Sequence, residues 1–467
     1  MTTTRPSSTE TRAGGLLSPA LRATTIGVVA LVSLHAFEAL ALTTVMPTIA
    51  RELDGESLYA MAFTATLAAG IVSIVWSGNL ADRRGPRPPL VIGLVLFAAG
   101  LIGAGLAPTM HVLIAARVVQ GLGAGMTSTA LYVVVTRVYP QRLHTAILAG
   151  FSAAWVVPSM IGPFIAGLIT QTLGWRWVFG LSLVVLVGAG MLLARILPSL
   201  SQDVVDVPWR HRALLCSLVL AVGVLTLNAA AENLDTRGIA LAAVAVAVVG
   251  VSVLPLTPHG TLRLARGLPT DIALRALAFA GFSGAEIYLP RLLTDRDGLS
   301  PTLAGLSLTV TGVTWFAGSS IQGRWNRRFE IGRTSAFALI LMTVTFVLMA
   351  LSVATGAPAW LLIALFPLAG FGIGTLYPRV TAQALARADA DEQGFVSSAL
   401  QIGDSAGGAT AIALSAVVFA AVGAAAAGSG AVGGAVGGAG GTAAYTAVFA
   451  VMALPVAVGA LAGRRVR

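Results

Sequence analysis

The chain is built mainly from apolar stretches, each long enough to cross a lipid bilayer, which are separated by short polar segments. Of its 467 residues, 56% are hydrophobic and 10% are charged. A soluble domain, by comparison, carries about 25% charged residues. A helix of about 20 apolar residues spans the hydrocarbon core, and inside that core the backbone must satisfy its own hydrogen bonds. The sequence therefore predicts an all-α, multi-pass membrane protein.

Fourteen stretches are candidate spans. They lie at about 24–50, 57–77, 90–107, 110–136, 145–170, 177–197, 213–232, 238–256, 272–292, 302–322, 334–354, 359–378, 394–422 and 443–463. A twelve-span alternative treats 199–271 as one long loop. It would leave two apolar helices in water, which the hydrophobic effect opposes. We therefore expect a cytoplasmic tail at 1–22, a six-helix bundle at 23–198, two additional helices at 199–270, a second six-helix bundle at 271–463 and a tail at 464–467.

All 29 basic residues are arginine, and their placement gives an orientation for this map. If the amino terminus lies inside, most of them fall on inner segments. The outer segments then hold Arg51, Arg176, Arg237, Arg291 and Arg296, while Arg117 falls within a span. An excess of basic residues in cytoplasmic segments is the positive-inside pattern. It predicts that both termini lie in the cytoplasm. The absence of lysine and the abundance of alanine, arginine and glycine suggest a high-GC bacterial genome, so we expect a bacterial cytoplasmic (inner) membrane.

The same composition excludes several classes of protein. Without lysine there is no Walker A phosphate loop and no Schiff-base chemistry, so we expect no nucleotide and no enzyme activity. The lone Cys216 and five scattered histidines offer no metal cluster. The arginines are spread loop by loop rather than gathered in one patch, which argues against a nucleic-acid partner.

A charged, glycine-punctuated segment, Gly78–Arg87, lies between the second and third spans. It resembles the G-x-L-A-D-R-x-G-R-[KR] pattern of the major facilitator superfamily. The matching positions are Gly78, Leu80, Ala81, Asp82, Arg83, Gly85 and Arg87, and Pro86 replaces a basic residue. The resemblance implies a secondary transporter of two six-helix bundles, in which this turn latches the cytoplasmic side; a simple positive-inside anchor is the alternative. Six plus two plus six spans is similar to the fourteen-helix drug:proton antiporter branch of that family.

Glu38 lies near the middle of the first span, where a charge costs at least about 2.5 kcal/mol on insertion scales. A carboxyl in apolar surroundings takes up a proton more readily than one in water, which suits a proton carrier. The segment Glu38–Pro47 resembles the branch's D-x-T-x-x-N-x-A-L-P pattern, with Glu38 at the acidic position. We predict a role in proton coupling, against the alternative of a structural carboxyl. His35, one turn earlier, is a candidate proton partner or cavity residue, against the alternative of a core histidine.

Arg117 and Gln120 share a face of the fourth span, in a run that resembles the family's R-x-x-q-G-x-g motif. An arginine keeps its proton at any useful pH, so Arg117 cannot carry the proton itself. It can hold a carboxylate charged, and we predict that it couples protonation to conformation; the alternative is a static anchor. Gln120 is a candidate for the substrate cavity.

The fifth span carries Pro158, Gly162, Pro163 and Gly167, and it resembles the antiporter motif G-x-x-x-G-P-x-x-G-G. Proline bends a helix, and glycine permits close approach of a neighbouring helix. We expect a bend that packs on the opposite bundle. The resemblance implies export rather than import.

Two further carboxylates, Glu286 and Asp404, fall within spans of the second bundle and are candidate proton or cation sites. Aromatic candidates for a substrate cavity are Phe151, Trp155, Phe282, Tyr288 and Trp315. Together these features predict a monomeric, cofactor-free exporter that exchanges a small amphipathic, cationic compound for protons. Two alternatives stay open: an exporter of an endogenous lipid or metabolite on the same fold, and a non-transporting receptor or passive channel.

Overall fold

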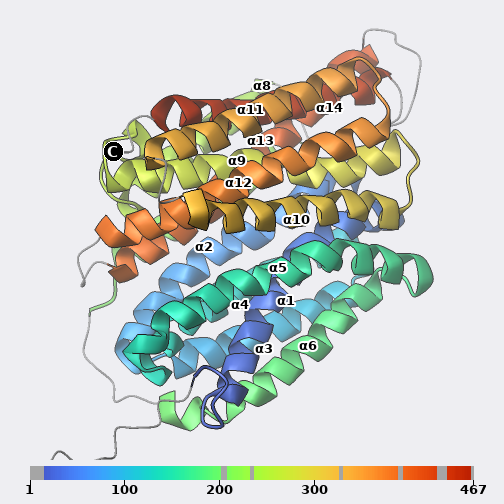
Figure 1. The fold of residues 1–467 in the computed structure, drawn as a ribbon. Coiled ribbons are helices and arrows are strands. Elements are labelled where there is room, and N and C mark those ends of the chain that lie inside the picture. The colour runs from blue at the N-terminus through green and yellow to red at the C-terminus, as the bar shows by residue number, and fades with distance from the viewer. Residues whose placement is uncertain are drawn as a thin grey trace, which may run out of the picture.

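The computed structural model describes residues 15–200, 208–231, 236–325, 330–387, 393–428 and 439–463. Within these ranges the chain forms long α-helices and no strand (Figure 1). The first eight are α1 (Arg22–Glu52), α2 (Tyr59–Arg84), α3 (Arg87–Gly105), α4 (Met110–Val138), α5 (Gln141–Thr172), α6 (Arg176–Ala194), α7 (His211–Ala229) and α8 (Thr236–Val253). The others are α9 (Leu268–Asp295), α10 (Pro301–Trp325), α11 (Ile331–Ala354), α12 (Ala359–Arg387), α13 (Gln393–Gly428) and α14 (Ala439–Ala462).

Each predicted span coincides with one of these helices, so the predicted all-α membrane fold is confirmed. In the described part of the chain, 13 helices are long and apolar enough to cross a membrane. The remaining long helix, α10, is rich in glycine, serine and threonine. Helices that pack against other helices inside a membrane favour such small residues, because they let the backbones approach closely.

The helices form two bundles. Helices α1 to α6 pack on one another as the N-terminal bundle, and α9 to α14 pack as the C-terminal bundle. Figure 1 shows the two as a blue-to-green layer below a yellow-to-red layer. They meet mainly along two seams, α5 against α10 and α2 against α13. Helix α7 lies beside the second seam, and α8 packs mainly on α7.

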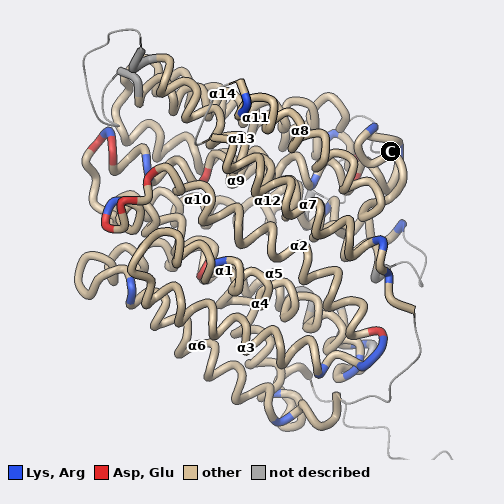
Figure 2. The backbone as a smooth tube through the Cα atoms, turned by 180° about the vertical axis from the view of Figure 1, so that it is seen from behind, with Lys and Arg blue, Asp and Glu red and all other residues tan. Residues whose placement is uncertain are grey.

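The two ends of the molecule differ in charge. The first helix begins and the last helix ends at one end, called here the termini end; the opposite end is called the far end. Figure 2 shows arginines gathered at the termini end, whereas the far end mixes acidic and basic residues. The arginines thus gather at the end to which the span map assigns the inner segments, and the orientation itself stays a prediction.

The segment predicted as a ten-residue turn, Gly78–Arg87, is mostly helical, which corrects that expectation. Helix α2 continues to Arg84 because Leu80 and Ala81 remain buried in the bundle. Gly85 then reverses the chain with φ 74° and ψ 177°, and α3 begins at Arg87. A positive φ of this kind favours glycine, so Gly85 is the residue that makes the short connection between α2 and α3.

Candidate functional site

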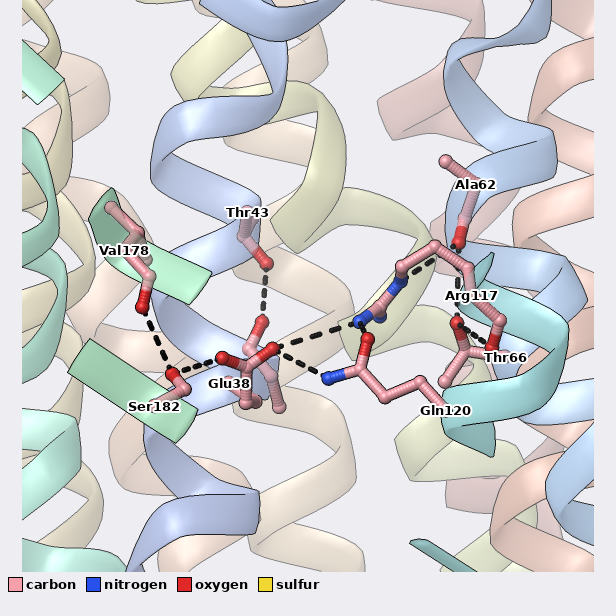
Figure 3. Close-up of polar contacts among 9 residues, drawn as sticks. Glu38, Thr43, Ala62, Thr66, Arg117, Gln120, Val178 and Ser182 are labelled. Atoms are coloured by element: carbon pink, nitrogen blue, oxygen red, sulfur yellow. Dashed lines mark hydrogen bonds and ion pairs between the residues drawn. The ribbon is translucent and has the colours of Figure 1, made fainter. Parts of the chain in front are cut away.

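A buried polar cluster lies inside the N-terminal bundle, where α1, α2, α4 and α6 come together (Figure 3). Glu38 on α1 and Arg117 on α4 are each 5% exposed, and 3.7 Å separates Glu38 Oε2 from Arg117 Nη1. Gln120 Nε2 donates to the same carboxylate oxygen at 2.8 Å. Ser182 on α6 donates to the other oxygen, Glu38 Oε1. The carboxylate is therefore held by three side chains from two other helices.

Gln120 links the two charged groups. Arg117 Nη1 donates to Gln120 Oε1 at 2.6 Å. Because arginine offers only donors, Gln120 turns its carbonyl toward Arg117 and keeps its amide N–H for Glu38. A change of charge on Glu38 therefore reaches Arg117 by two routes, directly and through the Gln120 side chain.

The Ser182 hydroxyl can serve either protonation state of Glu38. Its oxygen lies near Glu38 Oε1 and also 3.1 Å from the carbonyl oxygen of Val178, while it carries a single proton. If the carboxyl is ionised, the hydroxyl donates to it. If the carboxyl is protonated, it can donate to Ser182, and the hydroxyl then donates to Val178. The site can thus accept a proton without leaving a polar atom unpaired.

Close helix packing fixes this geometry. An added Cβ at Gly100 of α3 would lie 2.6 Å from Gln120 Cα, so only glycine lets α3 approach α4 there. On the other side, Thr66 of α2 donates to the Arg117 carbonyl oxygen at 3.3 Å. Arg117 Nε in turn donates to the Ala62 carbonyl oxygen at 3.5 Å. The arginine is thereby anchored to α2 as well as to the carboxylate.

The sequence pointed separately to Glu38, Arg117 and Gln120, and the structure brings them into one cluster. It did not point to Ser182, although a signal existed, since Ser182 is the one hydroxyl in the apolar run of α6. Among the described residues, His35 makes no hydrogen bond to Glu38. Its ring nitrogen is 3.2 Å from the Thr127 hydroxyl, and its ring packs 5.1 Å from that of Phe97.

A second ion pair, partly buried, lies in the C-terminal bundle. Arg275 of α9 grips Asp404 of α13 through two nitrogens, with 2.6 Å from Nη2 to Oδ2 and 3.1 Å from Nε to Oδ1. Arg275 also donates to Thr381 at 2.6 Å and lies 4.4 Å from the centre of the Tyr377 ring. The sequence analysis did not single out Arg275, although the predicted span 272–292 contains it. Helix α9 begins at Leu268, and this places Arg275 two turns inside it.

The other candidates are dispersed. Glu286 is partly buried on α9, and among the described residues its side chain has no hydrogen bond or ion pair. Phe282 meets the Trp315 ring edge-on at 5.3 Å. Phe151 is buried against Tyr132, whereas Trp155 is 46% exposed.

The two bundles are joined at the far end by a group called here the far-end cluster: Arg51, Glu56, Tyr59, Tyr288, Arg291, Asp295, Phe419 and Tyr445. Arg291 is its centre and is 5% exposed. Its guanidinium lies between the rings of Tyr59 and Phe419, 4.7 Å and 4.9 Å from their centres. Tyr288, a predicted cavity residue, is 1% exposed here. The sequence had treated Arg291 only as an outer-segment charge.

At the far-end cluster, residues of the N-terminal bundle contact residues of the C-terminal bundle. Arg291 pairs with Glu56 at 3.8 Å, and the Tyr59 hydroxyl donates to the Ile287 carbonyl oxygen at 2.5 Å. Arg51 reaches Asp295 at 4.0 Å. These contacts join the two bundles at the far end.

The predicted gating residues lie at the termini end. Arg83 stacks over Trp209 at 5.2 Å, ahead of α7, while Gly78 is partly buried and Arg87 is exposed. Asp82 is exposed, and among the described residues it has no hydrogen bond or ion pair. Of these residues, Arg83 thus contacts the segment that leads into α7.

The proline-glycine residues of α5 lie along the seam with α10. An added Cβ at Gly167 would lie 2.6 Å from Thr302 Cα, and one at Gly305 would lie 2.6 Å from the Pro163 carbonyl oxygen. Gly162 instead faces Phe37 of α1, and Pro158 is buried in α5. The glycines thus let backbones of opposite bundles approach closely.

Comparison with known proteins places this arrangement in context. The family model of the Major Facilitator Superfamily matches residues 28–412. A probable multidrug-efflux transporter of Mycobacterium tuberculosis is 28% identical over 411 residues, which cover 83% of this chain and 85% of that protein. The methylenomycin A resistance protein of Streptomyces coelicolor is 26% identical over 359 residues, 74% of each chain.

Solved structures agree with the fold. An auto-inhibited POT family peptide transporter has a TM-score of 0.68 at 15% identity and covers 94% of this chain and 97% of its own. A D-xylose–proton symporter has a TM-score of 0.62 at 16% identity, with coverage of 94% and 97%. At these identities the likeness concerns the fold alone.

Proposed function

Because the chain belongs to the major facilitator superfamily, we propose that it is a proton-coupled multidrug exporter that works by alternating access. It would bind a small amphipathic, cationic compound between the bundles and exchange it for incoming protons. The likeness to relatives described as a multidrug-efflux transporter and as an antibiotic resistance protein supports an export role.

The buried Glu38 cluster is the observation that carries this proposal. When Glu38 takes up a proton, its ion pair with Arg117 is lost, yet the arginine keeps its charge. A buried charge without a counter-ion is costly, so the protonated bundle favours an arrangement that solvates or re-pairs Arg117. Gln120 and Ser182 keep the carboxyl in place in both states. Proton binding is thereby linked to a change in helix packing.

The far-end cluster supplies the second conformational element. We propose that the termini lie in the cytoplasm of a bacterial inner membrane, so that the far end faces outward and is closed in this structure. Outward opening would break the contacts of Arg291 with Glu56 and Tyr59. Each inward proton supplies roughly 2.3 kcal/mol per 100 mV of membrane potential. A monomer could thus drive export without nucleotide or cofactor.

Dye transport into everted membrane vesicles tests the proposal. Ethidium uptake should follow an imposed proton gradient and stop when an uncoupler collapses it. Glu38→Gln should abolish uptake, because the amide cannot carry the proton. Glu330→Gln is the matched control, since that carboxyl is 83% exposed and pairs only weakly with Arg333, and it should leave uptake unchanged.

Three outcomes would contradict the proposal. Gradient-independent uptake would indicate a channel. Normal uptake by Glu38→Gln at equal expression would remove Glu38 from proton coupling. No uptake by the parent of any dye in a cationic panel, together with an altered lipid or metabolite profile in a deletion strain, would favour a different cargo.

A further inference from the structure

The two additional helices, α7 and α8, differ in how they contact the two bundles. Helix α7 lies beside the seam between α2 of the N-terminal bundle and α13 of the C-terminal bundle, and it contacts both (Figure 2). Helix α8 packs mainly on α7 and is otherwise largely exposed on the lipid side. If the bundles move relative to one another, this hairpin must follow one of them or slide on both.

The contact between α7 and α2 is polar at both ends. Toward the far end, Asn228 Nδ2 of α7 donates to Thr64 Oγ1 of α2 at 3.0 Å. The two residues are 3% and 0% exposed. No water competes for these groups in an apolar interior, so separating α7 from α2 would leave a side-chain amide unpaired.

A second polar attachment lies at the termini end, just before α7. The backbone N–H of Arg210 donates to Asn79 Oδ1 at 3.0 Å, and Asn79 Nδ2 donates to the Val75 carbonyl oxygen at 2.9 Å. Next to it, Arg83 stacks on the Trp209 ring. The hairpin is thus fastened to α2 at two points that lie at opposite ends of the membrane-spanning part.

The contact between α7 and α13 is of another kind. Leu220, Val224 and Leu227 of α7 share one apolar cluster with Ile402, Ala406, Ala409 and Ala413 of α13, and Ile71 and Ile74 of α2 belong to the same cluster. The α2 contact thus has polar and apolar parts, whereas the α13 contact is apolar. In the described part of these two helices, no hydrogen bond or ion pair joins them. Alanines present a low-relief surface, and apolar contacts have no fixed direction. Such a surface can slide or separate without leaving polar groups unpaired.

From this asymmetry we infer that α7 and α8 move as a rigid part of the N-terminal bundle, so that the second seam opens between α7 and α13. The hairpin is then a moving wall that shields the α2 side of the seam from lipid. This inference rests on the proposed alternating access and adds which surfaces separate during it.

Three spin-label sites in a Cys216→Ser background test the inference, since Cys216 is the single cysteine. All are exposed: Val91 of α3 reports the N-terminal bundle, Leu215 reports the hairpin and Phe337 of α11 reports the C-terminal bundle. Distances are measured by pulsed electron resonance on double-cysteine variants in liposomes, at high and low pH and with ethidium. We expect Val91–Leu215 to stay constant, while Leu215–Phe337 and Val91–Phe337 change together by several ångström.

The reference pair Val91–Phe337 separates the possible failures. If it does not change under any condition, alternating access itself fails, and the proposed function falls with it. If it changes while Leu215–Phe337 stays constant, the hairpin moves with the C-terminal bundle and the inference is wrong. A change in all three pairs would mean that the hairpin slides on both bundles, which also overturns it.

Asn228→Leu tests the attachment itself, with Ser217→Ala as the control on α7, because Ser217 bonds only within its own helix. The Val91–Leu215 distribution should broaden in Asn228→Leu and stay as narrow as the parent's in the control. A narrow distribution in both variants would show that the hydrogen bond does not hold the hairpin.

Discussion

The role of Arg291 in closing the far end can be tested by removing its charge in Arg291→Met, which keeps an apolar chain of similar length. Two interactions of Arg291 cross between bundles: the ion pair with Glu56 and the contact with the Tyr59 ring. Its contacts with Asp295 and Phe419 lie within the C-terminal bundle. They persist when the bundles separate, so they do not bias the equilibrium between closed and open far ends.

The size of the effect follows from the two crossing contacts. The Glu56 carboxylate is 45% exposed, and an ion pair of that kind contributes about 0.2–1 kcal/mol. A cation over an aromatic ring contributes about 0.5 kcal/mol when exposed and about 2 kcal/mol when desolvated, as Arg291 is. Together they amount to about 1–3 kcal/mol. The ratio of open to closed far ends should therefore rise roughly five- to 150-fold.

Labels on two exposed far-end residues, Leu106 of the N-terminal bundle and Trp360 of the C-terminal bundle, measure this ratio. The parent should show mainly the short distance, and Arg291→Met should gain a longer one. Arg296→Met is the matched control, because Arg296 contacts Asp297 and the Ala357 carbonyl oxygen, both in the C-terminal bundle. An unchanged distribution in Arg291→Met, or an equal shift in Arg296→Met, would refute the reasoning.

Three further predictions follow from the packing of the bundles. Gln120→Leu removes the amide that donates to Glu38, a charge-assisted hydrogen bond of about 1.5–3 kcal/mol. Dye efflux should therefore fall about tenfold or more. The control Thr136→Val, on the exposed face of α4, should leave efflux unchanged. Gly100→Ala should lower the free energy of unfolding by about 1–3 kcal/mol in detergent, because the new Cβ meets Gln120; Gly188→Ala, with open space around it, should have little effect. Arg275→Met leaves Asp404, which is 14% exposed, without its ion-pair partner and should destabilise the protein by about 1.5–3 kcal/mol. Arg333→Met, at an 81% exposed position, should have little effect, and equal melting temperatures for the two variants would argue against the Arg275–Asp404 pair.

Hydropathy located every long helix, because burial of apolar side chains in lipid is decided segment by segment. Hydropathy also identified α7 and α8 as helices rather than as parts of one long loop. The ends of the helices were less predictable. Gly78–Arg84 belongs to α2, beyond the predicted span 57–77, because Leu80 and Ala81 gain burial from neighbouring helices that hydropathy does not register.

The candidate site, too, could be predicted from the sequence only in part. The insertion cost of Glu38 and Arg117 made them candidates from the sequence, since a charge within a span needs a partner. Which partner each one has depends on the packing of α1, α4 and α6, whose residues lie far apart in the chain. The contacts of Ser182 and Arg291 could be recognised only in the folded structure.

The sequence alone determined that this is a multi-pass membrane protein, where its long helices lie, which segments carry the arginines and which family it resembles. These properties depend on composition along the chain, because the transfer of a segment into lipid depends mainly on the residues of that segment. Only the tertiary structure decided that Gln120 joins Glu38 to Arg117, that Arg291 contacts the opposite bundle, and that Asn228 bonds α7 to α2. Such choices depend on directional contacts between distant helices, and the direction of a side chain is set by packing.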